Sequence, residues 1–581
     1  MTRGGHAAWA MLAALAAVRA AAAFVPSMWG WGADALRFTA PIPGWSAWAV
    51  AALALIPALS RLLVPALERW GRSIDRAPRL AATAAALGSA ALVLLLPDRT
   101  WLTGDFLWRQ INLEGGASFG ALYPQAPPLD HLLHGAVARA LVHDLKLDPA
   151  DAGRALGALA ALLWGAAAVD AARAFELRGA AAGACAGAVL AGGALLLMTG
   201  LNKSYAELMP LAVLTCAGAA RVMKTGSGFA ALGAWLAAAL LAHRSALALI
   251  PGAALAMAWG WRAGAPAEGA AARARRDRAL GVALPALAAL AVIPSVLRAA
   301  ASVDRAHFAL TGGLGGWIGL QRLLDLGNAL LLAVPLAALA LVLAPRAIRS
   351  APRDARLLAA MGAPLVLGTL LVHPAHGVFR DTDVFEPGGV MLELWAAWAL
   401  GRTLLDEPRL AWLGVAAVLA AASATLTWLV HFGDVDRGIA RVEAFVAEPP
   451  ARDTAALAGA WDFLGFRRLD LGRTAEAASA FEHAAELVPT PRVLREWASV
   501  ELRRGDWSAV VAIWERLLAR DPANVAAWSE WASLAARNGD FARARAAADT
   551  VLRLDPGNRF ALGIRAALAR DSTAATRPPP P

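Results

Sequence analysis

The sequence predicts an all-α protein, in which a polytopic helical membrane domain is followed by a water-soluble array of helical hairpins. Of its 581 residues, 59% are hydrophobic and 17% are charged, so the chain has more apolar surface than a soluble protein can bury. Apolar runs of about 17 to 25 residues recur up to residue 430, and a helix of this length crosses a hydrocarbon core. Beyond Gly433 the pattern changes to charged amphipathic segments with a period of about 34 residues, which is typical of stacked helical hairpins.

We expect about thirteen membrane spans within residues 1–432. Their approximate ranges are 7–24, 43–66, 81–97, 152–171, 179–199, 207–223, 227–242, 245–260, 279–298, 323–345, 357–373, 388–405 and 409–430. The first run also fits a cleaved signal peptide, because Arg3, an apolar core and Ala21-Ala22-Ala23 follow that plan, although Arg19 interrupts it. Cleavage would leave every later loop on the same side of the membrane.

Arginines in the short loops predict the orientation of these spans. Clusters follow the second, eighth and tenth runs, namely Arg69, Arg72, Arg76 and Arg79; Arg262, Arg273, Arg275, Arg276 and Arg278; and Arg346, Arg349, Arg353 and Arg356. Loops rich in Arg and Lys stay in the cytoplasm. The N-terminus is therefore expected inside, and loops 98–150, 299–322 and 374–387 outside. With an odd number of spans, the C-terminal domain is outside too.

The charge and cysteine content exclude two classes of partner. The formal charge of +10 comes almost entirely from arginine in loops between apolar runs, so it indicates membrane orientation and no binding of nucleic acid. Cys185 and Cys216 lie inside apolar runs and lack the spacing of metal ligands. We expect neither a disulfide framework nor a zinc site.

The C-terminal hairpins resemble tetratricopeptide repeats. The residues that carry the resemblance are Trp461, Leu464, Gly465, Gly472, Ala477, Phe481, Ala484 and Pro489, then Trp497, Ala498, Gly505, Trp514 and Pro522, then Trp528, Trp531, Ala532, Gly539, Ala544, Ala548 and Pro556. We expect a linker at 433–452, the array with its capping helix at 453–570, and a disordered Pro-rich tail at 571–581. We expect the tryptophans of this domain to lie mainly in its hydrophobic core. The resemblance implies a concave face that binds a protein or glycan partner.

Three predicted outer stretches place ionisable residues beside the membrane, where such residues are costly unless solvated, paired or used. The first contains Asp98, Asp105 and Arg109, and continues through Pro127-Pro128-Leu129, Asp130 and His131; the second contains Lys203 and Glu207; the third contains His373, His376, Arg380, Asp381 and Asp383. A fourth segment adds Asp304, Arg305 and His307. We expect these segments to converge on one face and to form a site.

At Asp105 and Pro127-Pro128-Leu129 the chain resembles the GT-C superfamily of membrane glycosyltransferases, which use polyprenyl-phosphate-sugar donors on the outer face of the membrane. The stretch Arg380 to Asp383 also resembles outer-loop motifs of uncharacterised bacterial relatives with C-terminal tetratricopeptide repeats. One departure is that Asp105 follows Gly104 and has no adjacent second acid. The part played by a divalent metal ion therefore stays open.

The resemblance implies a bacterial inner-membrane enzyme that transfers a sugar outside the cytoplasm. Asp105 would be the base, and Glu207 or Asp383 would be a second acid or metal ligand. Arg380, Arg305 or Arg109 would bind the leaving phosphate, and Asp381 and His376 would complete the substrate site. Partners would then be membrane lipid, the lipid-linked sugar and an acceptor at the repeats.

Structural interpretations of the same residues stand beside this hypothesis. In these interpretations Asp105 caps a helix or is solvated, Glu207 pairs with Lys203 or Arg244, and Arg380 pairs with Asp381. The outer histidines, including His131, His134 and His243, would have interfacial or hydrogen-bonded roles. The whole chain would then be a membrane-anchored scaffold. A transporter is disfavoured, because the sequence shows no paired broken helices at matching places in two halves and few ionisable residues at mid-bilayer depth.

Overall fold

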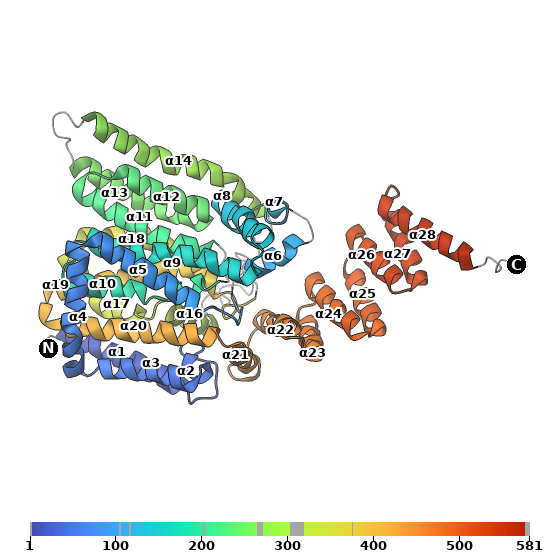
Figure 1. The fold of residues 1–581 in the computed structure, drawn as a ribbon, viewed down its shortest axis with the longest axis horizontal. Coiled ribbons are helices and arrows are strands. Elements are labelled where there is room, and N and C mark those ends of the chain that lie inside the picture. Colours follow the sequence, from blue (N-terminus) through green and yellow to red (C-terminus); the bar gives the residue numbers. More distant parts are fainter. Residues whose placement is uncertain are drawn as a thin grey trace. The chain divides into compact units, whose positions relative to one another are not determined.

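The computed structural model is helical throughout the residues that it describes, which are 3–103, 106–114, 118–200, 204–263, 271–301, 319–374 and 376–575. The chain divides into two compact units, Met1–Ala456 and Leu457–Pro581. Each unit is built from helices packed on helices (Figure 1). No strand occurs in the described ranges, so the all-α prediction is confirmed there.

Unit 1 is a bundle of long, roughly parallel and antiparallel apolar helices (Figure 1). Seven of the described helices are long and apolar enough to cross a membrane, namely α1 (Arg3–Ala22), α5 (Pro78–Leu95), α9 (Pro149–Ala174), α11 (Tyr205–Thr225), α14 (Ala271–Ala301), α18 (Pro352–Leu371) and α20 (Ala411–Phe432). Two bent pairs raise the number to nine. These helices fit a multi-pass membrane protein. Shorter helices fill the bundle, namely α10 (Ala180–Leu190), α12 (Phe229–Ala242) and α13 (Ile250–Ala263), together with α19 (Glu386–Asp406), which has 21 residues.

Two runs that we expected to be single spans, 43–66 and 323–345, are each broken in the structure. The first forms α3 (Pro41–Ala54) and α4 (Pro57–Arg76), which meet at 95°, and the second forms α16 (Leu320–Ala333) and α17 (Ala337–Ser350), which meet at 81°. Pro57 and Pro335 lie at these breaks, and proline disrupts a continuing helix because it has no N–H and clashes with the preceding turn. Broken helices are therefore present, contrary to our expectation from the sequence.

Successive helices alternate in direction, so the loops between them lie alternately at the two ends of the bundle. These two ends differ in charge. At one end, which we call the arginine end, α4 packs across the ends of α5, α10 and α20, and α13 finishes next to the start of α14 (Figure 1). This end carries the three arginine clusters named above. The opposite end, which we call the acidic end, holds the loop after α5, the start of α11 and the loop before α19.

Glycines on one face of α9 permit close backbone contact. Gly153, Gly157 and Gly165 lie four or eight residues apart, and a Cβ on any of them would fall within 2.4 Å of a backbone atom in the segment 198–200 or in α5. Small residues at this spacing let membrane helices approach closely, and dispersion contacts then hold them together.

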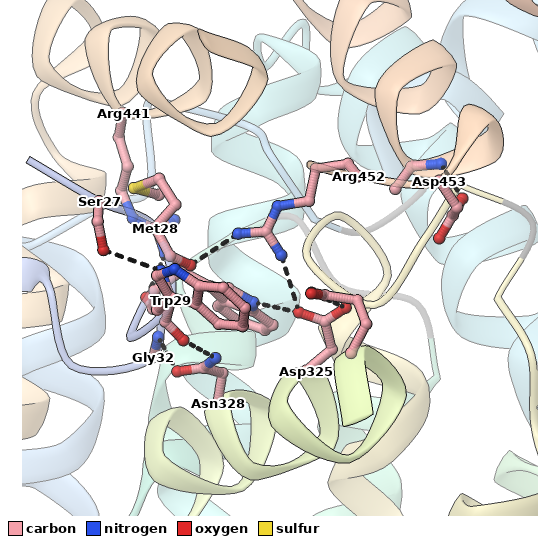
Figure 2. Close-up of polar contacts among 12 residues, drawn as sticks. Ser27, Met28, Trp29, Gly32, Asp325, Asn328, Arg441, Arg452 and Asp453 are labelled. Atoms are coloured by element: carbon pink, nitrogen blue, oxygen red, sulfur yellow. Dashed lines mark hydrogen bonds and ion pairs between the residues drawn. The ribbon is translucent and has the colours of Figure 1, made fainter. Parts of the chain in front are cut away.

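The last part of unit 1 is held to the rest of that unit by a polar cluster (Figure 2). Residues 433–452, where we expected a linker, contain the helix α21 (Val435–Ala447). Arg452 donates to Asp325 Oδ1 of α16 at 3.1 Å and to the carbonyl of Met28 at 2.7 Å. Asn328 of α16 bonds the backbone of Trp29 and Gly32, at 2.8 and 3.0 Å. The cluster ties this segment to the loop after α1.

Unit 2 is a row of short amphipathic helices. They are α22 (Thr454–Asp470), α23 (Thr474–Leu487), α24 (Pro491–Arg504), α25 (Trp507–Arg520), α26 (Val525–Arg537), α27 (Phe541–Leu554) and α28 (Arg559–Ala575). Each of α23 to α27 packs against the next helix in the row. Phe481, Trp514 and Trp531 are buried, and the indole of Trp531 stacks on those of Trp507 and Trp514, with centroids 5.6 and 5.5 Å apart.

Candidate functional site

A buried polar cluster lies at the acidic end, where the loop after α5 meets α11. The loop contributes α6 (Phe106–Glu114), α8 (Pro128–Asp130) and the π-helical segment η1 (His131–Val137). Pro127 is extended, because the proline that follows it disfavours the helical region, and Pro128 then begins α8. π-Helical turns are rare and are often found at functional sites. This one carries His134.

Asp130 is the hub of the cluster. Its Oδ1 lies 2.9 Å from Nη1 of Arg109 and 2.7 Å from Nδ1 of His134. The carboxyl group is almost fully buried, and so is the His134 ring. Gln110, next to Arg109 on α6, donates to the His134 carbonyl at 3.2 Å, so two neighbouring side chains of α6 join it to α8 and to η1.

Glu207, in the first turn of α11, lies beyond His134. Its Oε1 is 3.4 Å from Nε2 of His134, a contact that is an ion pair but does not satisfy hydrogen-bond geometry. Only 6% of Glu207 is exposed. Within the described part of the chain, neither carboxyl oxygen of Glu207 has a hydrogen-bond partner. Buried polar groups are rarely left without a hydrogen bond. The Glu207 carboxyl group can therefore accept a hydrogen bond from a substrate or from water.

The surroundings fix the charges of Asp130 and His134. Burial alone would raise the pKa of Asp130, but Arg109 and His134 outweigh it and lower the pKa to about 2. Burial alone would lower the pKa of His134, but the Glu207 charge and the Asp130 hydrogen bond raise it to about 9. At neutral pH an imidazolium therefore lies between two carboxyl groups. It orients Glu207 from one side while Asp130 orients the ring.

Aromatic rings pack around this chain of charges. Phe106 packs edge-on against His134, with centroids 5.8 Å apart, and the Arg109 guanidinium lies over the rings of Tyr123 and Phe119, at 5.1 and 5.5 Å. Such cation–π contacts are stronger where water is excluded. Arg109 is thus engaged by Asp130 and two rings. It suits a positioning role better than the phosphate-binding role that we expected from the sequence.

The third loop forms a separate set of contacts. The backbone N–H of His376 donates to Asp381 Oδ2 at 3.1 Å, and the His376 ring lies 3.4 Å from the same oxygen. Arg380 is half-buried, and Asp383 is buried where the short helix η6 (Thr382–Phe385) leads into α19. Asp381 thus shapes the loop. Two expected site residues, Asp105 and Arg305, lie outside the described residues.

Two further buried acids occur on α19. Glu386 and Glu393 are 1% and 2% exposed and lie two helical turns apart on one face. Within the described ranges, both oxygens of Glu393 and Oε2 of Glu386 lack a hydrogen-bond partner. A carboxyl group inside an apolar bundle is costly and is retained mainly for function. Glu386 lies in the third outer stretch but was not selected as a site residue, and Glu393 was missed, although acids seven residues apart in an apolar run are a recognisable pattern.

Asp130 and His134 were also not selected as site residues. Their spacing of four residues after a Pro-Pro start would have placed them on one helical face. The contact of His134 with Glu207, which is 73 residues further along the chain, could only come from the structure. In the described part of the chain, no three His, Cys, Asp or Glu side chains group as ligands for a metal ion.

Comparison with known proteins adds no assignment. A scan against protein-family models and a search of curated proteins both found no match to this chain.

Proposed function

We propose that this protein is a membrane glycosyltransferase, which takes a sugar from a polyprenyl-phosphate donor and attaches it to an acceptor hydroxyl. The observation that carries the proposal is the buried Glu207 carboxyl group, which His134 orients and which keeps its acceptor capacity unused. A positioned carboxyl group at the end of a membrane bundle can meet a substrate whose head group is in water and whose tail is in lipid.

The reaction needs one base and stabilisation of one leaving group. The acceptor oxygen forms a bond to C1 of the sugar, and the bond from C1 to the lipid-phosphate oxygen breaks. That oxygen keeps the electron pair, and the acceptor proton passes to a carboxylate. We assign Asp105 as this carboxylate, as the GT-C resemblance implies, and Glu207 as the second acid. Arg380 and Arg305 are the proposed partners of the leaving phosphate.

The residues that follow Asp105 in sequence contact the cluster that holds Glu207. Phe106 comes directly after Asp105 and packs on His134, and Arg109 lies one helical turn further on and pairs with Asp130. In this proposal Asp130, His134 and Arg109 are positioning residues. We derive no step that passes through a metal ion.

The proposed topology has thirteen passages through a bacterial inner membrane, with the arginine end in the cytoplasm and the acidic end outside. Its support is the concentration of arginines at helix ends such as those of α4, α13 and α17. A reporter fused after Arg570 should be active only outside the cytoplasm. Activity only in the cytoplasm would contradict the proposed location of the site.

We propose that unit 2 is a tetratricopeptide-type array that binds the acceptor or an assembly partner. The support is that its small and aromatic positions, including Ala477, Phe481, Ala532 and Ala544, are buried at helix crossings. A cavity of about 410 Å³ between α25, α26 and α27, lined in part by Trp528 and Arg543, favours partner binding. The same cavity favours the alternative function, a membrane-anchored scaffold without catalysis.

Transfer of labelled sugar distinguishes the enzyme from the scaffold. The full chain, reconstituted in lipid, is incubated with a panel of polyprenyl-phosphate hexoses and pentoses and with envelope acceptors. Asp105→Asn and Glu207→Gln should each lower transfer on the order of 10²–10⁴-fold. The matched control is Asp151→Asn, which changes an exposed acid at the same end of the bundle.

Variants that keep the wild-type unfolding midpoint but lose transfer support the enzyme. Full transfer by both Asp105→Asn and Glu207→Gln would refute the catalytic assignment, and no transfer by the wild type with any donor would favour the scaffold.

A further inference from the structure

The helix α4 lies across the long helices of unit 1 instead of along them. It follows α3 after a bend of 95°, and α3 runs beside α20 in the bundle. In Figure 1 α4 is accordingly perpendicular to the long helices, at the arginine end of unit 1. Its 20 residues make it about 30 Å long in the plane of that end. A helix in this orientation fits the head-group layer of a bilayer, which is parallel to the membrane surface.

One face of α4 is packed against the bundle and fixes this orientation. Gly71 lies so close to the segment before α10 that a Cβ on it would be 1.7 Å from the Gly179 carbonyl oxygen. The side chain of Leu67, one turn earlier, would lie 3.2 Å from a Cβ at Gly183. Near the end of α4, Asp75 accepts a hydrogen bond from the Gly179 N–H at 2.9 Å. Close backbone packing and a polar contact therefore hold α4 in its crossing position.

A second face of α4 is apolar and exposed. Its residues Leu59, Leu62, Leu63 and Ala66, which we call the leucine stripe, recur at the three- and four-residue spacing of one helical face. The three leucines are 38%, 73% and 47% exposed. The stripe continues the exposed apolar surface that precedes it, where Ile56 is 47% exposed. Acyl chains therefore fit as the surroundings of the stripe, because it adjoins the apolar surface of the long helices.

The third face of α4 is charged. Its residues Arg61, Glu68, Arg72 and Arg76 recur at spacings of seven, four and four residues, which places them together on the side away from the leucine stripe. Arg72 pairs with Glu68, at 3.4 Å. Arg61 and Arg69 are exposed and form no ion pair with another residue in the described ranges. The helix itself contains four arginines and two acids, so it carries a net positive charge.

We infer that α4 is an in-plane interfacial helix that binds the surface of an anionic lipid leaflet. The leucine stripe lies among the acyl chains, the charged face is in water, and Arg61 and Arg69 pair with lipid phosphates. Separate apolar and basic faces are typical of helices that lie in a membrane interface, and arginines near the surface favour anionic lipids. A soluble protein partner is disfavoured, because the stripe adjoins the apolar surface of the long helices. This inference is independent of the proposed reaction.

A fluorophore on single introduced cysteines tests the orientation of α4 in the full chain. Leu62→Cys places the label on the leucine stripe, and Arg72→Cys places it on the charged face. The native Cys185 and Cys216 are buried and stay unlabelled. Leu87→Cys on α5, at a position that is 60% exposed, is the reference for a lipid-facing site. The protein is reconstituted in vesicles of phosphatidylcholine and phosphatidylglycerol in equal parts. Acyl-brominated lipids quench the label from the hydrocarbon, and iodide on both sides of the vesicle quenches it from water.

We expect brominated lipid to quench the labels at Leu62 and Leu87 more strongly than iodide does, and the reverse order at Arg72. Stronger quenching by iodide at Leu62 would show that the leucine stripe faces water and would overturn the proposal. Protection of the Leu62 label from both quenchers would show that protein covers the stripe, which would overturn it as well.

The preference for anionic lipid is measured with the same label at Leu62, by comparing brominated phosphatidylglycerol with brominated phosphatidylcholine. Phosphatidylglycerol should bind about fivefold more tightly at this position, and Arg61→Gln with Arg69→Gln should abolish the preference. The matched control is Arg520→Gln with Arg537→Gln, which makes the same change in net charge at exposed positions of unit 2 and should keep the preference. An unchanged preference in the α4 variant, or an equal loss in both variants, would overturn the anionic-lipid assignment.

Discussion

The His134 cluster predicts how the stability of the protein depends on pH. His134 is fully buried between Asp130 and Glu207, and these groups raise its pKa from 6.5 to about 9. A group whose pKa is raised in the folded state contributes stability that is fully present below its unfolded pKa. That contribution is lost as the pH rises through the folded pKa. The unfolding free energy should therefore fall between pH 6.5 and about 9.

The size of this effect follows from the shift in pKa. A change from 6.5 to about 9 corresponds to roughly 3 kcal/mol. Replacing His134 by Gln should remove this pH-dependent part, so that the difference in stability between wild type and variant shrinks by roughly 3 kcal/mol from pH 6 to pH 9.5. Asp130 does not contribute in this window, because its pKa is lowered to about 2.

Equilibrium unfolding in detergent micelles at a series of pH values measures this difference. The matched control is His131→Gln, which removes the neighbouring ring on the same π-helical segment. His131 packs on Phe119, with ring centroids 5.1 Å apart, and pairs with no carboxyl group of the described residues. The control should keep the wild-type loss of stability. If His134→Gln and the wild type lose stability in parallel up to pH 9.5, the charged imidazolium and the orientation of Glu207 that depends on it are refuted.

Three further substitutions test packing, capping and burial by the same unfolding measurement. Gly165→Leu should lower the free energy of unfolding by about 3 kcal/mol, because its Cβ would lie 2.4 Å from the backbone of Ala85 in α5. The control Gly88→Leu, on α5, should be neutral, because nothing lies within 4 Å of a Cβ at that position. Equal effects of the two substitutions would contradict this packing. Asp277→Ala should cost about 2 kcal/mol, because three N–H groups of α12 lose their acceptor, and an unchanged midpoint would contradict the cap. Glu393→Met should stabilise by about 2 kcal/mol, because it removes a buried carboxyl group without a hydrogen-bond partner in the described chain, and destabilisation would show that the acid is structurally required.

The candidate site was only partly predictable. Glu207 was selected because an ionisable side chain at the end of an apolar run is costly unless it is solvated, paired or functional. The structure places it in a buried cluster. Arg109 was selected too, but its partner is a carboxylate 21 residues further along the chain. Asp130 and His134 were missed as site residues, because their importance comes from a contact with a distant helix. Sequence position does not encode which loop residues fold back onto which span.

The pattern of apolar runs by itself predicted that the chain is helical, as its described residues are, and that its long apolar helices fit a multi-pass membrane protein, because backbone polar groups in lipid must be satisfied within each helix. The change to a period of about 34 residues likewise determined that short amphipathic helices follow. Only the tertiary structure decided that the run 43–66 bends by 95° and that α4 crosses the helix ends at the arginine end. Hydropathy records how apolar a segment is, whereas its direction depends on the helices it packs against. For the same reason, only the structure could join Asp130, His134 and Glu207 into one buried cluster.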